Sequence, residues 1–510
     1  MPARMEFTVN LPRSAPPAQP VAADAPLRIL VMADFSGRSQ REPAANRLDL
    51  DNRPLLDVDV DTLDAVMARL APQLRLPVAG GSVTVSFHQL DDFHPDALYQ
   101  RLDLFQALRR SRARLLNPAS FAQAVAELSP APVADVVTTH PPARHEADAE
   151  LLNRLLGRPP AATEVRAMPR ETESATMLDG LLRTLVEPHI VHSDPRQSAW
   201  VDAVDAAIGD QLRALLHQPA FQALEAAWRG VHGLVSGLES DAVRITLLDL
   251  SWQELLADLR TAGGVPEASG LYARLIDRDA RLADGQPWSL LVADYTLGNA
   301  PEDIALLALL GAVAARAGGP LLAAADPALP GCTTVADLAD PGRWTPPSDV
   351  NARNWQALRH CVVAPWLGLA LPRILLRLPY GAKTDALEHL SFEEMPLGRD
   401  PRAYLWGNPA FACARLIATA FVEQGGDFYP GAVQQLDDLP AHIYEQEGER
   451  LMQPATEVLL GERAALALLD QGLMPLLGFR QRNALRLARV QSLAEPATEL
   501  AGRWSLQDHR

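Results

Sequence analysis

Three carboxylates in the middle of the chain have the residue types and the spacing that could support chemistry. Asp294 follows the apolar run 289–293, and Glu302 and Asp303 come directly after Pro301, where a helix is expected to begin. Acidic groups at a strand end beside a helix N-terminus can hold a metal or act as acid and base. The same pattern has a structural explanation, because Pro followed by acidic side chains complements the dipole of a starting helix. We favour the structural role; a hydrolase or metal enzyme around these carboxylates is the remote alternative.

Other motifs of known chemistry are missing from the sequence. It contains no GxSxG nucleophile elbow, no GxxxxGK[ST] phosphate loop, and no HxxxH or CxxC metal spacing. The three cysteines, Cys332, Cys361 and Cys413, lie far apart, which is typical of a reducing compartment. We therefore predict that the chain is not an enzyme, with no catalytic residue, no cofactor and no metal.

The elements that must position these carboxylates follow an α/β pattern. Apolar runs bounded by turn residues predict buried strands, and apolar residues at helical spacing predict helices between them. Alternation of this kind favours mixed sheets flanked by helices. The expected strands are 27–33, 83–87, 243–248, 289–293 and 321–325, and the expected helices include 61–71, 201–215, 221–234 and 301–315.

Composition changes along the chain predict its domain organisation. Residues 1–26 are expected to form an N-terminal arm, and residues 27–128 an α/β domain in which two helices after residue 95 are broken near Asn117. Residues 129–197, rich in Pro, Ala, Thr and His, are expected to be a linker with two short helical patches. Residues 198–510 regain a regular pattern and predict a second α/β domain.

Several large side chains are candidates for core packing or for a protein interface. Phe221 and Trp228 recur at helical spacing on one predicted helix. Tyr295 follows Asp294, and Trp406 and Asn408 stand at an expected turn or helix start. Packing in the core is the favoured role, and an interface is the alternative.

The charge of the chain excludes some classes of partner. The formal net charge is −17, so phosphate-rich nucleic acids and anionic membranes are repelled. No apolar stretch reaches the roughly 20 residues that span a bilayer. We expect a cytoplasmic protein without nucleic-acid partners or membrane insertion.

Several collinear segments resemble the large sheath subunit of type VI secretion systems, TssC. They are HQPAFQALEAAWRGVHGLV (217–235), VADYTLGNAPEDIALLALLGAVAARAGGPLLAAADPAL (292–329), LGLALPRILLRLPYG (367–381), FEE (392–394) and LWGNPAFACA (405–414). Near the N-terminus, LRILVMADFSGR (27–38) and VSFHQLDDFHPDAL (85–98) resemble the small subunit, TssB. The sequence thus resembles a shortened natural fusion of the two subunits.

This resemblance implies a structural role in a contractile machine. It implies the contractile-sheath, phage tail sheath-like fold with two to three domains, and assembly with other sheath subunits or copies of itself. Baseplate components, an inner-tube protein and a ClpV-type AAA+ ATPase are the further partners that it implies. No chemical step occurs in the sheath. The eight candidate residues named above are then expected to be structural or interface residues.

The sequence departs from the family pattern in ways that favour an alternative. The family's large subunit continues well beyond the segment that 491–496 resembles, whereas this sequence stops at Arg510. That tail belongs to the joint between subunits in the family. A non-polymerising cap, adaptor or assembly initiator built on the sheath fold is therefore the alternative function.

Overall fold

The computed structural model describes residues 25–40, 49–78, 81–128, 196–238, 240–278, 286–345 and 349–506. The chain divides into two compact units. One consists of residues up to Phe105 together with those from Ile208 onward, and the other of Gln106–Ala207. Nearly all of the predicted arm and of the predicted linker, with its two helical patches, lies outside the described residues.

A sheet of nine strands forms the centre of the first unit, counted over the described residues. Its strand order is β11-β15-β14-β8-β7-β6-β1-β5-β2. The six strands from β14 to β5 are parallel to their neighbours, and β2, β15 and β11 are antiparallel. The sheet contains β1 (Leu27–Ala33), β2 (Leu56–Val58), β5 (Val243–Asp249), β6 (Leu290–Leu297), β7 (Leu321–Ala325), β8 (Leu367–Leu371), β11 (Gln435–Leu436), β14 (Leu473–Gly478) and β15 (Leu485–Leu487).

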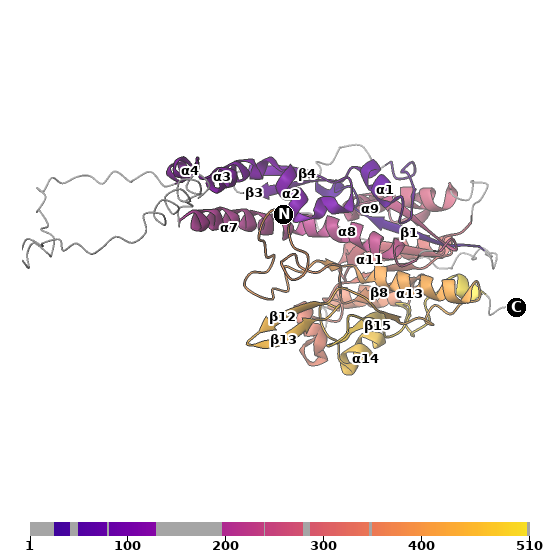
Figure 1. Ribbon diagram of the computed structural model, residues 1–510. Coiled ribbons are helices and arrows are strands. Elements are labelled where there is room, and N and C mark those ends of the chain that lie inside the picture. Colours follow the sequence, from indigo (N-terminus) through magenta and orange to yellow (C-terminus); the bar gives the residue numbers. More distant parts are fainter. Residues whose placement is uncertain are drawn as a thin grey trace, which may run out of the picture. The chain divides into compact units, whose positions relative to one another are not determined.

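Helices cover both faces of this sheet, as the apolar parallel strands require. Helix α11 (Pro301–Ala317) lies in one core cluster with residues such as Leu30 and Leu291. Helix α13 (Pro409–Gln424) contacts β6, β7 and β8 but shares no residue with that cluster, so it covers the opposite face (Figure 1).

The remaining helices and strands of the first unit lie around the sheet. Three antiparallel pairs form separate two-stranded sheets. These are β3 (Gln73–Val78) with β4 (Gly81–Ser86), β9 (Ile374–Leu375) with β10 (Trp406–Gly407), and β12 (His442–Gln446) with β13 (Glu449–Gln453). The helices are α1 (Leu63–Leu70), α2 (Pro95–Arg101), α8 (Pro219–Val235), α9 (Trp252–Thr261), α10 (Gly270–Tyr272), α12 (Asp349–Arg359) and α14 (Glu462–Asp470).

The second unit is a small helical assembly. It contains α3 (Gln106–Leu116), α4 (Phe121–Leu128) and the first part of α7 (Gln197–Leu216). Arg112 forms an ion pair with Asp205 at 2.5 Å, and the Gln197 side chain donates to the carbonyl of Leu115 at 2.6 Å. These contacts join α3 to α7 within this unit.

The structure confirms most of the predicted elements in the described residues. The strand at 27–33 matches β1, the helix at 221–234 lies within α8, and the helix at 301–315 lies within α11. The two helices predicted after residue 95 are three, α2, α3 and α4, because the chain leaves helical geometry at Leu102. The break at Asn117 is present between α3 and α4.

Candidate interaction site: the seam between residues 25–105 and 208–506

The central strand β1 comes from the N-terminal part of the chain and pairs on both sides with strands from the C-terminal part. Its seven residues pair with β5 from Leu27–Val243 to Ala33–Asp249. On its other side, Ile29 to Met32 pair with Leu290 to Ala293 of β6. Six of the seven β1 residues are buried. Residues 25–105 and 208–506 therefore share one sheet, and we call their contact surface the seam.

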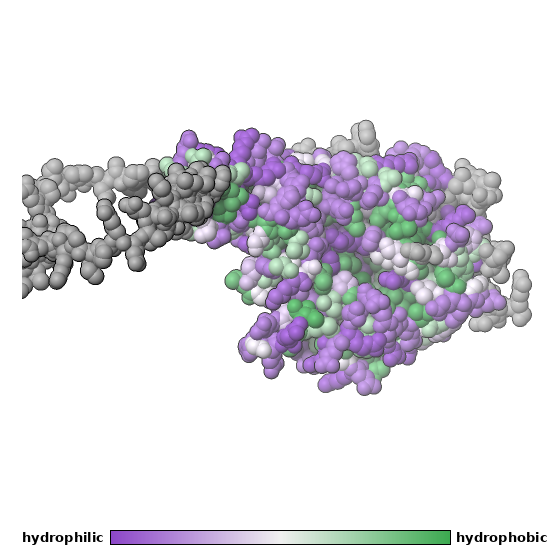
Figure 2. Space-filling model, viewed as in Figure 1, coloured by the Kyte–Doolittle hydropathy of each residue, from purple (hydrophilic) through white to green (hydrophobic). Residues whose placement is uncertain are grey.

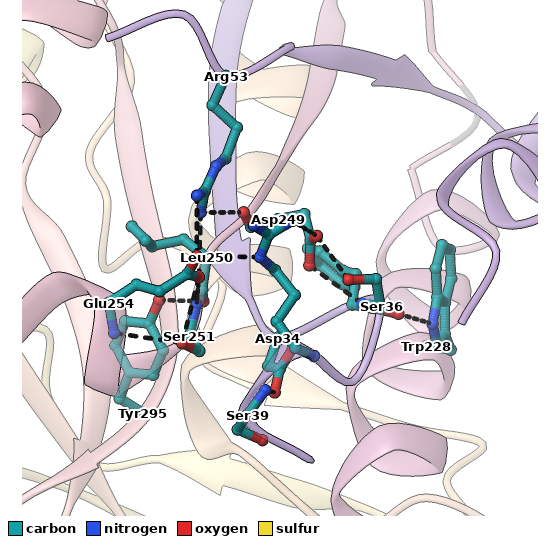
Figure 3. Close-up of polar contacts among 12 residues, drawn as sticks. Asp34, Ser36, Ser39, Arg53, Trp228, Asp249, Leu250, Ser251, Glu254 and Tyr295 are labelled. Atoms are coloured by element: carbon teal, nitrogen blue, oxygen red, sulfur yellow. Dashed lines mark hydrogen bonds and ion pairs between the residues drawn. The ribbon is translucent and has the colours of Figure 1, made fainter. Parts of the chain in front are cut away.

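A tight turn after β1 begins a polar network across the seam (Figure 3). Asp34 accepts hydrogen bonds from the backbone N–H groups of Arg38 at 2.6 Å and Ser39 at 2.9 Å. Gly37 has φ +71°, and a Cβ there would lie 2.6 Å from the carbonyl oxygen of Gln73, so the turn needs glycine. The turn places Ser36 and Arg38 against the end of β5.

Asp249, the last residue of β5, is the first C-terminal partner of this turn. Its carboxylate accepts from the Ser36 N–H at 3.0 Å and from the Ser36 hydroxyl at 2.7 Å. Burial raises the pKa of Asp249, although the hydrogen bonds from Ser36 oppose that rise. Two hydrogen-bond donors from the N-terminal part therefore offset the cost of burying this carboxylate in the seam.

Glu254 is the second partner and has two structural roles (Figure 3). It forms a capping box with Ser251 at the start of α9, accepting from the Ser251 N–H at 3.1 Å. It also pairs with Arg53 at 2.9 Å and with Arg38 at 3.0 Å, both from the N-terminal part. Burial would raise the pKa of Glu254, but the hydrogen bonds from Arg53 and Ser251 lower it. Arg53 also donates to the carbonyl of Asp249 at 2.9 Å.

The predicted stripe of α8 packs against the N-terminal part. Trp228 is fully buried, and its indole N–H donates to the carbonyl of Phe35 at 2.9 Å. The rings of Trp228 and Phe35 lie 5.2 Å apart. Phe221, also fully buried, meets the rings of Phe87 and Phe93 edge-on at 5.8 and 5.6 Å. The two residues lie in the core and, at the same time, in the seam.

The structure brings Asp294, Tyr295 and Asn408 together near the end of β6. Asn408 donates to the carbonyl of Tyr295 at 3.2 Å and caps α13 through its side-chain oxygen. The Tyr295 hydroxyl donates to the carbonyl of Leu250 at 2.6 Å, and burial raises the pKa of Tyr295. Burial also raises the pKa of Asp294 to about 6, with a hydrogen bond from Asn408 opposing it. These contacts tie β6 to α13 and to β5.

Glu302 and Asp303 occupy the first turn of α11. Asp303 accepts from the backbone N–H of Gly298 at 3.1 Å, and burial raises the pKa of Asp303. Within the described residues, no group of three or more His, Cys, Asp or Glu side chains is arranged to hold a metal ion. The contacts of Asp303 are those of a helix-start residue.

Trp406 has its partners in the C-terminal part, although its strand contacts α8. It stands in β10 and forms a small core cluster with Leu375 and Tyr404. Its indole N–H donates to the carbonyl of Pro401 at 2.9 Å.

A cavity of about 340 Å³ opens at the carboxyl ends of β1 and β6. Asp34 and Gly37 from the N-terminal part line it together with Trp252 and Asp294 from the C-terminal part. Asp34 already accepts two backbone hydrogen bonds, so it contributes to the turn rather than facing the cavity unpaired.

Sequence reasoning missed a buried charge cluster on the C-terminal side. Arg377 donates to Glu225 of α8 at 2.8 Å and to Glu394 at 2.8 Å. Glu394 also accepts from the backbone N–H of Tyr380 at 2.9 Å. Burial opposes ionisation of Glu394, but Arg377 lowers its pKa to about 2. The available signal was Glu225 inside the apolar stripe of α8, a charge that a buried helix face holds only when it is paired.

Comparison with known families identifies both sides of the seam. The VipB family, described as EvpB/VC_A0108, tail sheath N-terminal domain, matches residues 198–494. The chain belongs to this sheath family. The type VI secretion system VipA family, described as VipA, VC_A0107 or Hcp2, matches residues 18–134. The chain is therefore a fusion of a VipA-like (TssB) part and a VipB-like (TssC) part, and a structural sheath component of a type VI secretion system.

Two curated relatives match the two parts separately. The type VI secretion system sheath protein TssC1 of Pseudomonas aeruginosa is 31% identical over 351 residues, which are 64% of this chain and 69% of the relative. The sheath protein TssB1 of the same organism is 30% identical over 94 residues, 17% of this chain and 52% of the relative. None of the described helices is long and apolar enough to cross a membrane. The seam thus joins the VipA-like and VipB-like parts within one chain.

Proposed function

We propose that the chain works as a single-chain sheath protomer that assembles with other sheath subunits or with copies of itself. The observation that supports this proposal most strongly is the position of β1. A strand of the VipA-like part lies between β5 and β6 of the VipB-like part, so the two parts have the relation of one folded protomer. On this proposal the contractile-sheath fold spans both parts. The VipA-like part then extends over residues 27–128 and the VipB-like part over residues 198–510.

The function so proposed is mechanical and not enzymatic. Asp294 and Asp303, the carboxylates that suggested chemistry, accept hydrogen bonds that join β6, α13 and α11. The cavity near Asp294 lies at the seam, where it is lined by both parts of the protomer. We expect no hydrolase activity that depends on Asp294. A comparison of the wild type with Asp294→Asn tests this expectation.

Further partners and the location follow from the sheath role and are proposals as well. They are baseplate components, an inner-tube protein and a ClpV-type AAA+ ATPase, in the cytoplasm. A pull-down with the full chain as bait, against each of these components from the same secretion system, tests the proposed partners. A Trp228→Ala variant shows whether capture depends on an intact seam.

Negative-stain electron microscopy of the purified chain, alone and with the sheath subunits of its own system, tests the proposal. Hollow tubes that contain the chain are expected for a sheath protomer. Discrete particles that bind only to tube ends or to baseplate components would favour the cap, adaptor or initiator instead. Neither tubes nor binding to any sheath component would overturn the assembly role.

A further inference from the structure

One outer edge of the nine-stranded sheet is acidic. Strand β2 is the last strand on this side. Asp57 lies in it, Asp59 and Asp61 follow it, and Asp64 lies in the first turn of α1; all four are exposed. We call these four residues the acidic edge. Hydrogen bonds from Thr62 lower the pKa of Asp59, which therefore stays ionised. Among the described residues, none of the four forms an ion pair with an arginine or lysine, although Asp64 lies near enough to His232 to interact with it electrostatically.

Near the opposite edge of the same sheet, strand β15 and its flanks are basic, whereas the outermost strand, β11, is followed by the exposed carboxylates Asp437 and Asp438. Arg480, Arg482, Arg486 and Arg489 lie along β15 and its flanks, and all four are exposed. We call these residues the basic edge. Arg482 pairs with Asp437 at 3.1 Å, with both side chains more than half exposed. Arg486 donates only to the amide oxygen of Gln434 in the described part of the chain. Two of the four arginines, Arg480 and Arg489, have no carboxylate partner among the described residues.

The two edges cannot neutralise each other within one molecule. Seven spacings of about 4.8 Å between neighbouring strands separate β15 from β2, which is roughly 34 Å. This distance is several times the screening length of about 10 Å at 0.1 M salt. Figure 1 shows α1, which carries Asp64, and β15 on opposite sides of the unit. In the same view the surface around β15 and α14 is mainly hydrophilic (Figure 2).

We propose that the acidic edge of one copy of this chain binds the basic edge of a second copy. The proposal rests on the sheath function proposed above and names the surfaces through which protomers meet. In a chain of net charge −17, four exposed arginines on one edge provide a place where an acidic copy can dock. A contact between two different surfaces repeats from copy to copy and builds rings or helical filaments.

Charged edge strands also have a simpler explanation, because charge prevents unwanted pairing of exposed strands. Each edge here does repel a copy of itself. Protection alone does not require opposite signs at the two ends, however, and opposite signs leave the head-to-tail contact favourable. The two explanations therefore differ in one measurable property, which is attraction between unlike edges.

Charge reversal on the full chain separates them. Asp61→Arg reverses part of the acidic edge, and the double variant Arg480→Glu/Arg489→Glu reverses part of the basic edge. None of these three side chains has a hydrogen-bond or ion-pair partner in the described residues, so folding is expected to be unchanged, as a thermal melt checks. Arg402→Glu/Arg450→Glu, at exposed arginines away from both edges, is the control with the same charge change as the double variant.

Sedimentation velocity at low and high salt is the measurement. The wild type is expected to self-associate, less so at high salt, and each edge variant to associate about tenfold more weakly. An equimolar mixture of the two edge variants should regain association, because each supplies the edge that the other lacks. The control should behave as the wild type.

Other outcomes overturn the inference. These are a wild type that stays monomeric, edge variants that associate as the wild type does, a mixture that does not recover, or a control that weakens equally. Tubes that form from the edge variants with unchanged yield would remove this inference and leave the sheath function standing. A wild type that neither self-associates nor binds sheath components would remove both.

Discussion

Trp228 provides the sharpest test of the seam. The side chain is fully buried, donates to the carbonyl of Phe35 at 2.9 Å, and has its ring 5.2 Å from that of Phe35. Loss of the donor leaves a buried carbonyl unpaired, which costs about 1–3 kcal/mol. The aromatic pair adds about 0.5–1.5 kcal/mol. Truncation of a buried tryptophan to alanine costs about 3–5 kcal/mol overall, including the cavity.

We therefore expect Trp228→Phe to lower the free energy of unfolding by about 1–3 kcal/mol, and Trp228→Ala by about 3–5 kcal/mol. Guanidinium unfolding, followed by far-UV circular dichroism, measures both. Hydrogen exchange adds the decisive readout, because β1 of the VipA-like part should lose protection together with β5 and β6. Trp406→Ala is the control, since the partners of Trp406, which are Leu375, Tyr404 and Pro401, all belong to the VipB-like part.

The result that refutes this reasoning is a Trp228→Ala protein with unchanged unfolding. A loss of protection confined to α8, with β1 still protected, would equally contradict a shared core. Trp406→Ala is expected to lower stability without a selective effect on β1.

Three further predictions concern charges. Glu254→Gln should lower the free energy of unfolding by about 3 kcal/mol, because it leaves the buried Arg53 without its carboxylate. In a double-mutant cycle measured by denaturant unfolding, adding Arg53→Met to Glu254→Gln should recover part of that loss. Arg377 lowers the pKa of Glu394 from its ordinary value of 4.5 to about 2. The stability that this ion pair provides above pH 4.5 should therefore be lost as the pH falls toward 2. Glu394→Gln should lack this loss when the free energy of unfolding is measured as a function of pH. The pKa of Asp294 rises from 3.8 to about 6, so the folded state binds more protons and stability should fall as the pH rises through this window; Asp294→Asn, without that slope, is the comparison.

The longest elements were predictable because their local pattern is unambiguous. Strand β1 is an apolar run ended by Asp34, Ser36 and Gly37, and α11 is an apolar helix that begins at Pro301. Each is buried on all sides, so local composition and tertiary environment agree. The two- and three-residue strands β2, β10, β11 and β15 were not predicted, because such segments are too short to have a period and exist through their partners.

The seam was only partly predictable from the sequence. The helical spacing of Phe221 and Trp228 indicates a buried stripe, but not that the stripe packs on Phe35 and Phe87. The partners of Asp249 and Glu254 lie about 200 residues earlier in the chain, and no local pattern encodes a contact of that separation. Only the family resemblance related the two sides of the seam in advance, because residues 27–38 and 217–235 resemble two subunits of the same sheath.

Cutting the chain between its two family-like parts tests the central claim most directly. A protease site placed between residues 129 and 195, outside the described residues, leaves the whole seam untouched. After cleavage of the purified full chain, the account predicts that both fragments elute together in size-exclusion chromatography and unfold in one transition, because β1 remains paired with β5 and β6. Fragments that separate under native conditions and unfold independently would contradict the claim that the VipA-like and VipB-like parts form a single sheath protomer.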